Sequence, residues 1–193
     1  KQLLSIVTTP IFRAVTTERI LSTPETFGSF KVYIRLKDKM LPHDSVTHYL
    51  PQYQLLVLTP PACENPQYAQ TIECIMPLDY SLLDSWKSNR HADYKSYETF
   101  KKCKAQDVIQ IINAIYPNIN DCIADYFTST SLSFRDIYHS PQGAMYGLSS
   151  PIGGVTTKVE NLFLTGQNCF MHGFYGTLCT AIETVNAIEN KYE

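Results

Sequence analysis

The residues best suited to chemistry stand in a glycine-bearing segment near the C-terminus, residues 161–188. Its sequence, NLFLTGQNCFMHGFYGTLCTAIETVNAI, begins as a short apolar run, passes three glycines and ends with helical periodicity. Those glycines are Gly166, Gly173 and Gly176. A strand that breaks at glycine and restarts as a helix favours binding of a phosphorylated or electron-rich cofactor. The reason is that a helix start offers unpaired backbone N–H groups and the positive end of a dipole.

Other familiar site patterns are absent from the sequence. It contains no HExxH, no GxSxG and no GxxxxGK[ST]. Its five histidines never form a ligand pair at helical spacing, so no metal site is predicted, and no catalytic residue is named. A GxGxxG turn after a strand, which dinucleotide binding of the Rossmann type requires, is also missing.

Composition limits the class of protein. The chain has 193 residues, of which 44% are hydrophobic and 18% charged, which is typical of a globular protein. A net charge of −2 gives no reason to expect a nucleic-acid partner. No apolar run approaches the length of a membrane span. Six cysteines without a CxxC pair favour reduced thiols and a cytoplasmic location.

The elements that must position the glycines are predicted from periodicity, and together they indicate a mixed α+β fold. Strands are predicted over residues 29–36, 53–59, 71–76, 126–134 and 161–165, and helices after Asp79 and over residues 92–116 and 175–190, with a short helix from Asn120 or Asp121. The apolar positions of the last helix share one face: Leu178, Ala181, Ile182, Val185 and Ile188.

Two stretches of the sequence resemble a known family. SLSFRDIYHSPQGAMYGL and VENLFLTGQNCFMHGFYGTLCTAIETVNAI look like the C-terminal end of phytoene-desaturase-type flavoproteins, which include carotenoid desaturases, carotenoid isomerases and retinol saturase. The family's motifs correspond to residues 131–135, 144–147 and 161–167. The resemblance covers residues 29–188 and is specific from about residue 128. The chain departs from the family at Ser131, where a proline is usual, and in the HGFYG entry to the last helix.

The resemblance implies a section of a larger FAD enzyme. Residues 1–127 would form part of a substrate-binding domain, a β-sheet with flanking helices. Residues 128–193 would supply the strand and helix that complete a Rossmann-type FAD domain. The N-terminal part of that domain would lie outside this chain and would be its partner, which would account for the missing GxGxxG. The chain by itself would then be inactive.

The resemblance also assigns site residues. The residues expected to bind FAD are Gly166, Gln167, Asn168, His172, Gly173, Phe174, Tyr175, Gly176 and Thr177. Those expected to face the substrate are Arg135 and Tyr146. His172 would hydrogen-bond the flavin or protonate the substrate, and a purely structural histidine is an equal alternative. We expect Gly176→Val to weaken flavin retention while the fold stays largely intact.

The predicted function is an FAD-dependent oxidoreductase that acts on carbon–carbon double bonds of an apolar isoprenoid, resembling a carotenoid or retinoid, as saturase, desaturase or isomerase. NAD(P) is a candidate electron donor or acceptor, and peripheral contact with a membrane is an open alternative for its location. A second hypothesis remains: a non-enzymatic apolar-ligand or protein-interaction module without a cofactor, in which the glycines serve only as turns.

Overall fold

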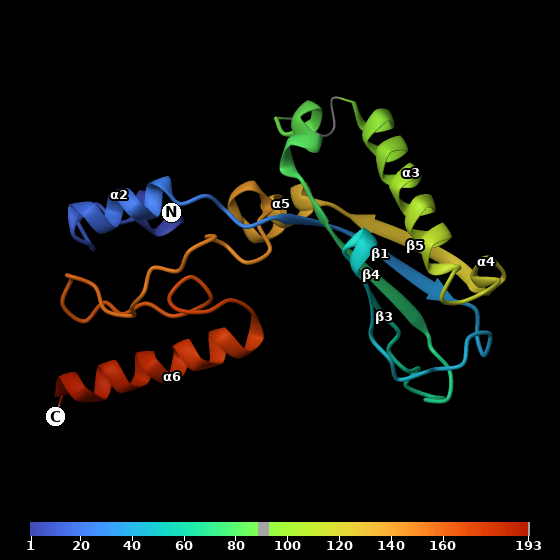
Figure 1. The fold of residues 1–193 in the computed structure, drawn as a ribbon. Coiled ribbons are helices and arrows are strands. Elements are labelled where there is room, and N and C mark those ends of the chain that lie inside the picture. The colour runs from blue at the N-terminus through green and yellow to red at the C-terminus, as the bar shows by residue number, and fades with distance from the viewer. Residues whose placement is uncertain (89–92, 193) are drawn as a thin grey trace. The chain divides into compact units, whose positions relative to one another are not determined.

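The computed structural model describes residues 1–88 and 93–192, and the chain divides into two compact units (Figure 1). The first unit joins Lys1–Thr26 to Ala144–Glu193. The second unit is the continuous segment Phe27–Gly143. Both ends of the chain therefore belong to the same unit, and the second unit is inserted between them.

The second unit is built on a five-stranded antiparallel sheet with the order β2-β3-β4-β1-β5. The strands are β1 (Gly28–Leu36), β2 (His48–Leu50), β3 (Leu55–Leu58), β4 (Thr71–Leu78) and β5 (Ile123–Ser129). The longest strand, β1, is central and pairs with both β4 and β5. Side chains alternate along β1: Phe30, Val32 and Ile34 are fully buried on one face, while Lys31, Tyr33 and Arg35 occupy the other.

One long helix covers the buried face of this sheet, as Figure 1 shows. The helical segments of the unit are η1 (Pro51–Tyr53), η2 (Tyr80–Trp86), α3 (Tyr94–Ile112), α4 (Ile119–Cys122), α5 (Ser131–Tyr138) and η3 (Pro141–Gly143). The core side of α3 carries Ala105, Val108 and Ile112, which share one cluster with the β1 side chains. Burying a valine or isoleucine side chain contributes roughly 1.5–3 kcal/mol, so the packing of Val108 and Ile112 against the sheet stabilises this unit.

Most elements predicted in this unit are confirmed. Strands are found where residues 29–36, 53–59 and 71–76 predicted them. A short 3-10 helix follows Asp79, whose carboxylate accepts a hydrogen bond from the Ser81 amide at 2.8 Å. The long helix is also present, although residues 89–92 lie outside the described part of the chain.

One strand prediction in this unit is wrong in part. Residues 126–134 were expected to be extended, but β5 ends at Ser129 and α5 begins at Ser131. Thr130 is the cause: its hydroxyl accepts a hydrogen bond from the Leu132 amide at 3.1 Å and caps the new helix. A local cap therefore overrides the β preference of the residues that follow.

The first unit contains helices and a long irregular segment. Its helices are α1 (Gln2–Ile6), α2 (Ala14–Ser22) and α6 (Gly173–Tyr192). A small core of Ile11, Phe12, Ile20 and Leu148 joins α1 and α2 to the irregular segment. The helix α6 is attached to that segment by a hydrogen bond of 2.8 Å from the Thr184 hydroxyl to the Leu164 carbonyl. Residues 144–172 run between them without a helix or strand longer than a bridge.

The strand predicted at residues 161–165 is not formed. Phe163 makes only an isolated antiparallel bridge to Thr156, and Asn161 has a positive φ of 63°. A strand needs a continuous ladder of backbone hydrogen bonds, and the ladder that residues 155–156 offer is too short. The Rossmann-type character of this unit is therefore not confirmed, whereas the mixed α and β composition is.

The two compact units do not follow the predicted boundary between residues 127 and 128. The first unit includes residues 1–26, and the second unit extends to Gly143. Which segment serves which functional domain stays a prediction. Among the described helices, none combines the length and the apolar character needed to cross a membrane.

Candidate functional site

The residues predicted to bind a cofactor lie in the segment that leads into α6 and in the first turn of that helix, within the first unit. Two of the glycines have backbone conformations that suit glycine: φ is +105° at Gly166 and +79° at Gly173. A Cβ added at either position would meet no atom within 4 Å. Both backbones therefore face open space, and a ligand group can approach them closely.

Gly176 has a different role from these two. It is buried, and a Cβ there would lie 2.4 Å from the carbonyl oxygen of Met171. The close approach of the 171 backbone to the first turn of α6 thus requires glycine. The expectation that Gly176→Val would leave the fold largely intact is wrong, because the substitution forces the backbone apart before any cofactor is considered.

Asn168 fixes the loop of residues 147–152 through its hydrogen bonds. Its side-chain oxygen accepts a hydrogen bond from the Leu148 amide at 2.8 Å, and its carbonyl accepts one from the Ile152 amide at 2.7 Å. The same side chain packs against Gly147, where φ is +70° and a Cβ would lie 2.2 Å from the amide oxygen. The Asn168 oxygen is thus engaged inside the protein, while Gln167 is half-buried beside the open Gly166 backbone.

His172 and Tyr146 are brought together in this unit although 26 positions separate them in sequence. Their rings stack with centroids 6.0 Å apart at an interplanar angle of 23°. The Nε2 atom of His172 is buried and has no hydrogen-bond partner among the described residues. A buried polar atom without a partner is costly, so this nitrogen is a natural contact for a ligand at the same turn.

The first turn of α6 presents aromatic side chains to solvent. Phe174 is 89% exposed and Tyr175 is 69% exposed. Neither ring therefore belongs to the buried core of this unit. Thr177 donates its hydroxyl to the Gly173 carbonyl at 2.9 Å, which closes the turn.

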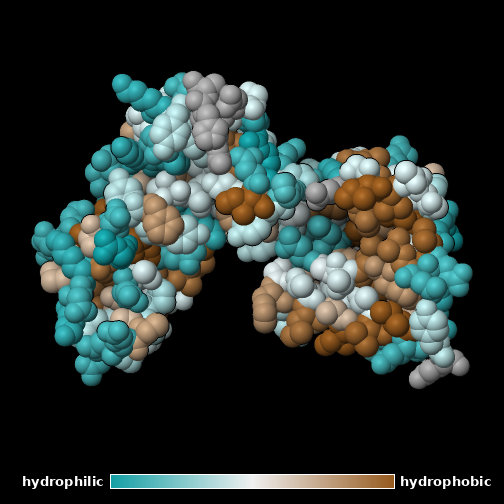
Figure 2. Space-filling model, turned by 180° about the vertical axis from the view of Figure 1, so that it is seen from behind, coloured by the Kyte–Doolittle hydropathy of each residue, from teal (hydrophilic) through white to brown (hydrophobic). Residues whose placement is uncertain are grey.

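The dipole of α6 affects the electrostatic potential at its first turn. With 20 residues α6 is long enough for a full macrodipole, and its first turn carries no acidic residue. The turn can therefore stabilise negative charge. Its apolar face is exposed as well: Leu178 is 50%, Ile182 55% and Val185 52% exposed. Figure 2 shows brown surface over this helix, on the lower right.

Arg135 lies in the second unit, on α5, and its guanidinium is committed to local partners. It donates to Asp136 at 2.7 Å, to the Lys87 carbonyl at 2.5 Å and to the Tyr80 hydroxyl at 3.4 Å. The hydrogen bond to Asp136 is the main reason that the pKa of Arg135 is raised above its ordinary value. These contacts clamp η2 to α5. Arg135 belongs to the second unit, whereas the residues around α6 belong to the first.

Sequence patterns missed two groups in the second unit. The first is a hydrogen-bond network centred on Asp44, which accepts from Tyr116 and Thr59 at 3.1 and 3.2 Å and pairs with His48 at 3.1 Å. Burial raises the pKa of Asp44, but hydrogen bonds from His48, the Val46 amide and these two hydroxyls outweigh it and lower the pKa to about 2. No local signal could have shown a network whose members are 72 positions apart.

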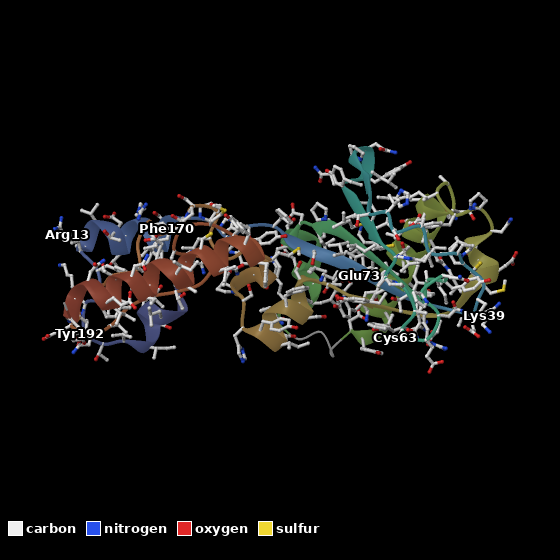
Figure 3. All side chains as sticks on the ribbon, turned by 90° about the horizontal axis from the view of Figure 1, so that it is seen from below. Arg13, Lys39, Cys63, Glu73, Phe170 and Tyr192 are labelled. Atoms are coloured by element: carbon white, nitrogen blue, oxygen red, sulfur yellow. The ribbon has the colours of Figure 1, made fainter. Side chains whose placement is uncertain are left out.

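The second group lies on the sheet face opposite α3. Tyr33 stacks on Phe127 with ring centroids 4.8 Å apart, and Lys31 forms an ion pair with Glu73 at 3.5 Å. Figure 3 labels Glu73 on the sheet. The alternation along β1 was the available signal, since it put Lys31 and Tyr33 on one face. Their partners on β4 and β5 could not be read from it.

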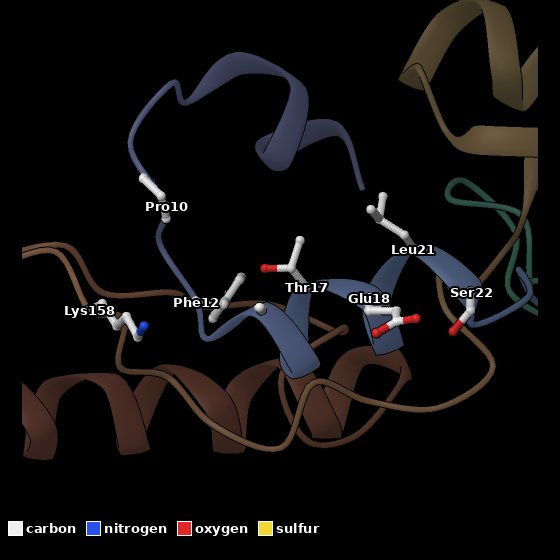
Figure 4. Close-up of a pocket in the computed structure, with 8 residues that line it drawn as sticks. Pro10, Phe12, Thr17, Glu18, Leu21, Ser22 and Lys158 are labelled. Carbon is white, nitrogen blue, oxygen red and sulfur yellow. The ribbon is translucent and has the colours of Figure 1, made fainter.

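A shallow groove is also present in the first unit, lined mainly by apolar atoms of Pro10, Phe12 and Leu21, with Glu18 and Lys158 at its edge (Figure 4). No pattern in the sequence indicated this groove. Within residues 1–88 and 93–192 no group of three or more His, Cys, Asp or Glu side chains could hold a metal ion.

Comparison with known proteins gives a consistent set of relatives. The chain is 27% identical over 135 residues to the all-trans-retinol 13,14-reductase of Danio rerio and 23% identical over 168 residues to that of Homo sapiens. A similar match, 22% identical over 168 residues, is found in Rattus norvegicus. These matches cover 63% to 77% of the chain. The resemblance to a retinol saturase-like group is therefore confirmed.

The chain spans only about a quarter of the length of these curated relatives: 22% of the fish protein and 27% of the human one. No protein-family model matches the sequence.

Proposed function

From the similarity to all-trans-retinol 13,14-reductases, we propose that this chain is a section of an FAD-dependent oxidoreductase. Its substrate would be an apolar isoprenoid resembling a retinoid or carotenoid, and the reaction would change the saturation of a carbon–carbon double bond. The relatives support an oxidoreductase that acts on a retinoid. The observation that supports the flavin is the glycine-bearing segment of residues 166–177, which leads into α6 and forms its first turn with the Gly166 and Gly173 backbones open.

The turn fits one edge of a flavin on three grounds. The Gly166 and Gly173 backbones are open to close approach. The N-terminus of α6 favours negative charge, as develops on a reduced flavin ring. The buried Nε2 of His172 has no partner among the described residues, and a ligand would supply one. The pyrophosphate-binding turn has no counterpart in this sequence, so the chain would supply only part of the cradle.

In this proposal the residues around α6 would bind and orient the cofactor. A bound FAD would supply the hydride chemistry. The α6 dipole would stabilise the negative charge on its ring. The Asn168 hydrogen bonds fix the loop that carries Tyr146, and the stacked Tyr146 and His172 rings would form one wall beside the turn. His172 would hydrogen-bond the flavin or the substrate through Nε2.

The missing part of the cradle would come from further residues of the same polypeptide. The exposed apolar stripe of α6 supports this partner, because helices of globular proteins normally bury such a face. In the isolated chain the stripe would promote self-association. NAD(P) as electron donor or acceptor, and contact with a membrane surface, remain predictions.

The test is the flavin content of the longer polypeptide that includes this chain. We expect it to purify with flavin absorbance, while residues 1–193 alone stay colourless. In the longer polypeptide, Ile182→Lys should lower the melting temperature and the flavin content together, whereas Lys104→Met on α3 should change neither. A longer polypeptide that is colourless and does not take up added FAD would overturn the assignment.

A non-enzymatic apolar-ligand module is the second candidate, and the groove bounded by Phe12 and Leu21 favours it. The gene sequence separates the two hypotheses. An upstream strand–GxGxxG–helix in the same reading frame eliminates the module, and its absence removes the main support of the flavoenzyme.

A further inference from the structure

The sheet of the second unit has one long edge that no other strand covers. β5 stands at the end of the strand order and, within the described residues, pairs only with β1 (Figure 1). The opposite edge strand, β2, has three residues, whereas β5 has seven, all of them exposed or half-buried. An edge strand carries a row of unpaired backbone groups, which is a template for pairing with another strand.

The hydrogen bonds around β1 show which residues of β5 face this open edge. The Leu36 amide donates to the Gln70 carbonyl, on the side of β4. Neighbouring residues of an antiparallel strand direct their N–H and C=O groups to opposite sides. Residues 31, 33 and 35 of β1 therefore bond to their partners 129, 127 and 125 of β5. The backbone groups of Tyr126 and Thr128 then point to the open edge, where the Tyr126 amide donates to the exposed Asp125 carboxylate at 2.8 Å.

The residues of β5 give this edge little protection against pairing. Natural edge strands commonly carry lysine or proline, or are interrupted by a bulge. The sequence of β5, IADYFTS, contains neither lysine nor proline and is rich in residues that favour strands. A register shift between Arg35 and Leu36 affects only its first residues, and the pairing is regular from Asp125 to Ser129. A further strand can therefore pair with this part of β5.

A groove beside the edge adds a preference for particular side chains. It has a volume of about 530 Å³ and lies between α3 and the start of β5. Its lining residues are uncharged: Gln106, Ile109, Gln110, Asn120, Ile123 and Tyr126. A strand added to β5 lies about 4.8 Å from it, so alternate side chains of that strand reach the groove. Uncharged side chains fit there, because a charge would lose water without gaining an ionic partner.

We propose that β5 pairs with an extended segment of the same polypeptide that lies outside residues 1–193 and adds a sixth strand to the sheet. The chain spans only 22% to 27% of the length of its relatives, so most of a polypeptide of their length lies outside it. The proposal rests on the proposed function, in which this chain is a section of a longer enzyme. The segment carries uncharged side chains towards α3 and a basic side chain opposite Asp125, whose carboxylate forms no ion pair among the described residues.

The first measurement is amide hydrogen exchange of β5, in residues 1–193 and in the longer polypeptide that includes them. We expect the Tyr126 and Thr128 amides to exchange about a hundredfold more slowly in the longer polypeptide, because they gain carbonyl acceptors there. The Phe127 amide, which faces β1, is the internal reference and should be protected in both. Equal exchange of Tyr126 and Thr128 in both samples, with Phe127 protected, overturns the inference. Protection that already appears in residues 1–193 and rises with protein concentration identifies a second copy as the partner, and also overturns it.

Two variants distinguish strand pairing at this edge from unspecific burial. Gln110→Lys places a charge in the groove, and Asp125→Lys reverses the charge at the edge. Each should speed exchange of the Thr128 amide about tenfold in the longer polypeptide and leave its rate in residues 1–193 unchanged. Gln52→Lys is the matched control, since Gln52 is an exposed amide on η1, away from β5, and should change neither rate. An unchanged rate in both edge variants contradicts the assigned pairing.

The flavin assignment is judged separately, on the colour of the longer polypeptide. A longer polypeptide that contains flavin but leaves the Tyr126 and Thr128 amides unprotected overturns only the pairing of β5. A colourless one in which these amides are protected overturns only the flavin assignment.

Discussion

The hydrogen-bond network around Asp44 leads to a quantitative prediction of how the free energy of unfolding depends on pH. Asp44→Asn removes a carboxylate that holds the loop before β2 to β3 and to the residues after α3, through Thr59 and Tyr116. The substitution keeps the size of the side chain, removes its negative charge and replaces one acceptor oxygen by an NH2 donor. We expect the variant to be less stable than the wild type at neutral pH.

The magnitude follows from the pKa of Asp44. Folding lowers this pKa from 3.8 to about 2, and each pKa unit is worth about 1.4 kcal/mol, which sets an upper limit of roughly 2.5 kcal/mol. The side chain is 33% exposed, so solvent screening reduces the expected contribution to about 1 kcal/mol. Because the folded pKa is the lower one, this stability is present above about pH 4. It is lost as the pH falls through the folded value of about 2.

Urea unfolding followed by Trp86 fluorescence is the assay. Trp86 is the only tryptophan, and its ring packs against Tyr97 and Phe100, so its signal reports the second unit. The difference between wild type and Asp44→Asn should be about 1 kcal/mol at pH 7 and should shrink towards zero near pH 2. Asp38→Asn, at an exposed position, serves as the control for charge removal. A difference that is absent at pH 7, or that does not change with pH, refutes the reasoning.

Three further predictions concern the first unit and the clamp on α5. Gly176→Ala should lower the helical circular dichroism signal and the melting temperature, because its Cβ would lie 2.4 Å from the Met171 carbonyl oxygen; an unchanged melt would show that the turn adapts freely. Asn168→Ala should cost about 1 kcal/mol and speed hydrogen exchange of the Leu148 amide, which loses its acceptor; equal exchange rates would contradict this. Arg135→Lys should cost roughly 1–2 kcal/mol in urea unfolding, since lysine cannot reproduce three divergent hydrogen bonds; Lys95→Arg, on the exposed side of α3, is expected to be neutral.

Much of the candidate site could be predicted from the sequence, because its signals are local. Glycines at 166 and 173 followed by helical periodicity indicated the open turn and α6, and both are present. The roles within the turn could not be predicted. The contact of Gly176 and Asn168 with a cofactor stays a prediction. The structure adds that the Met171 backbone requires glycine at position 176 and that the Asn168 side chain accepts a hydrogen bond from the Leu148 amide.

The sequence by itself determined the elements whose signals repeat over a few residues. Alternation gave β1, and the 3.6-residue period gave α3 and α6. Only the tertiary structure decided which distant residues those elements contact. Tyr33 reaches Phe127, and Asp44 reaches Tyr116, only because the antiparallel register and the packing of α3 bring distant segments together. Long-range pairing depends on the whole arrangement of the sheet, which no short pattern contains. For the same reason, an apolar stripe on α6 was predictable, but that it stays uncovered in this chain was visible only in three dimensions.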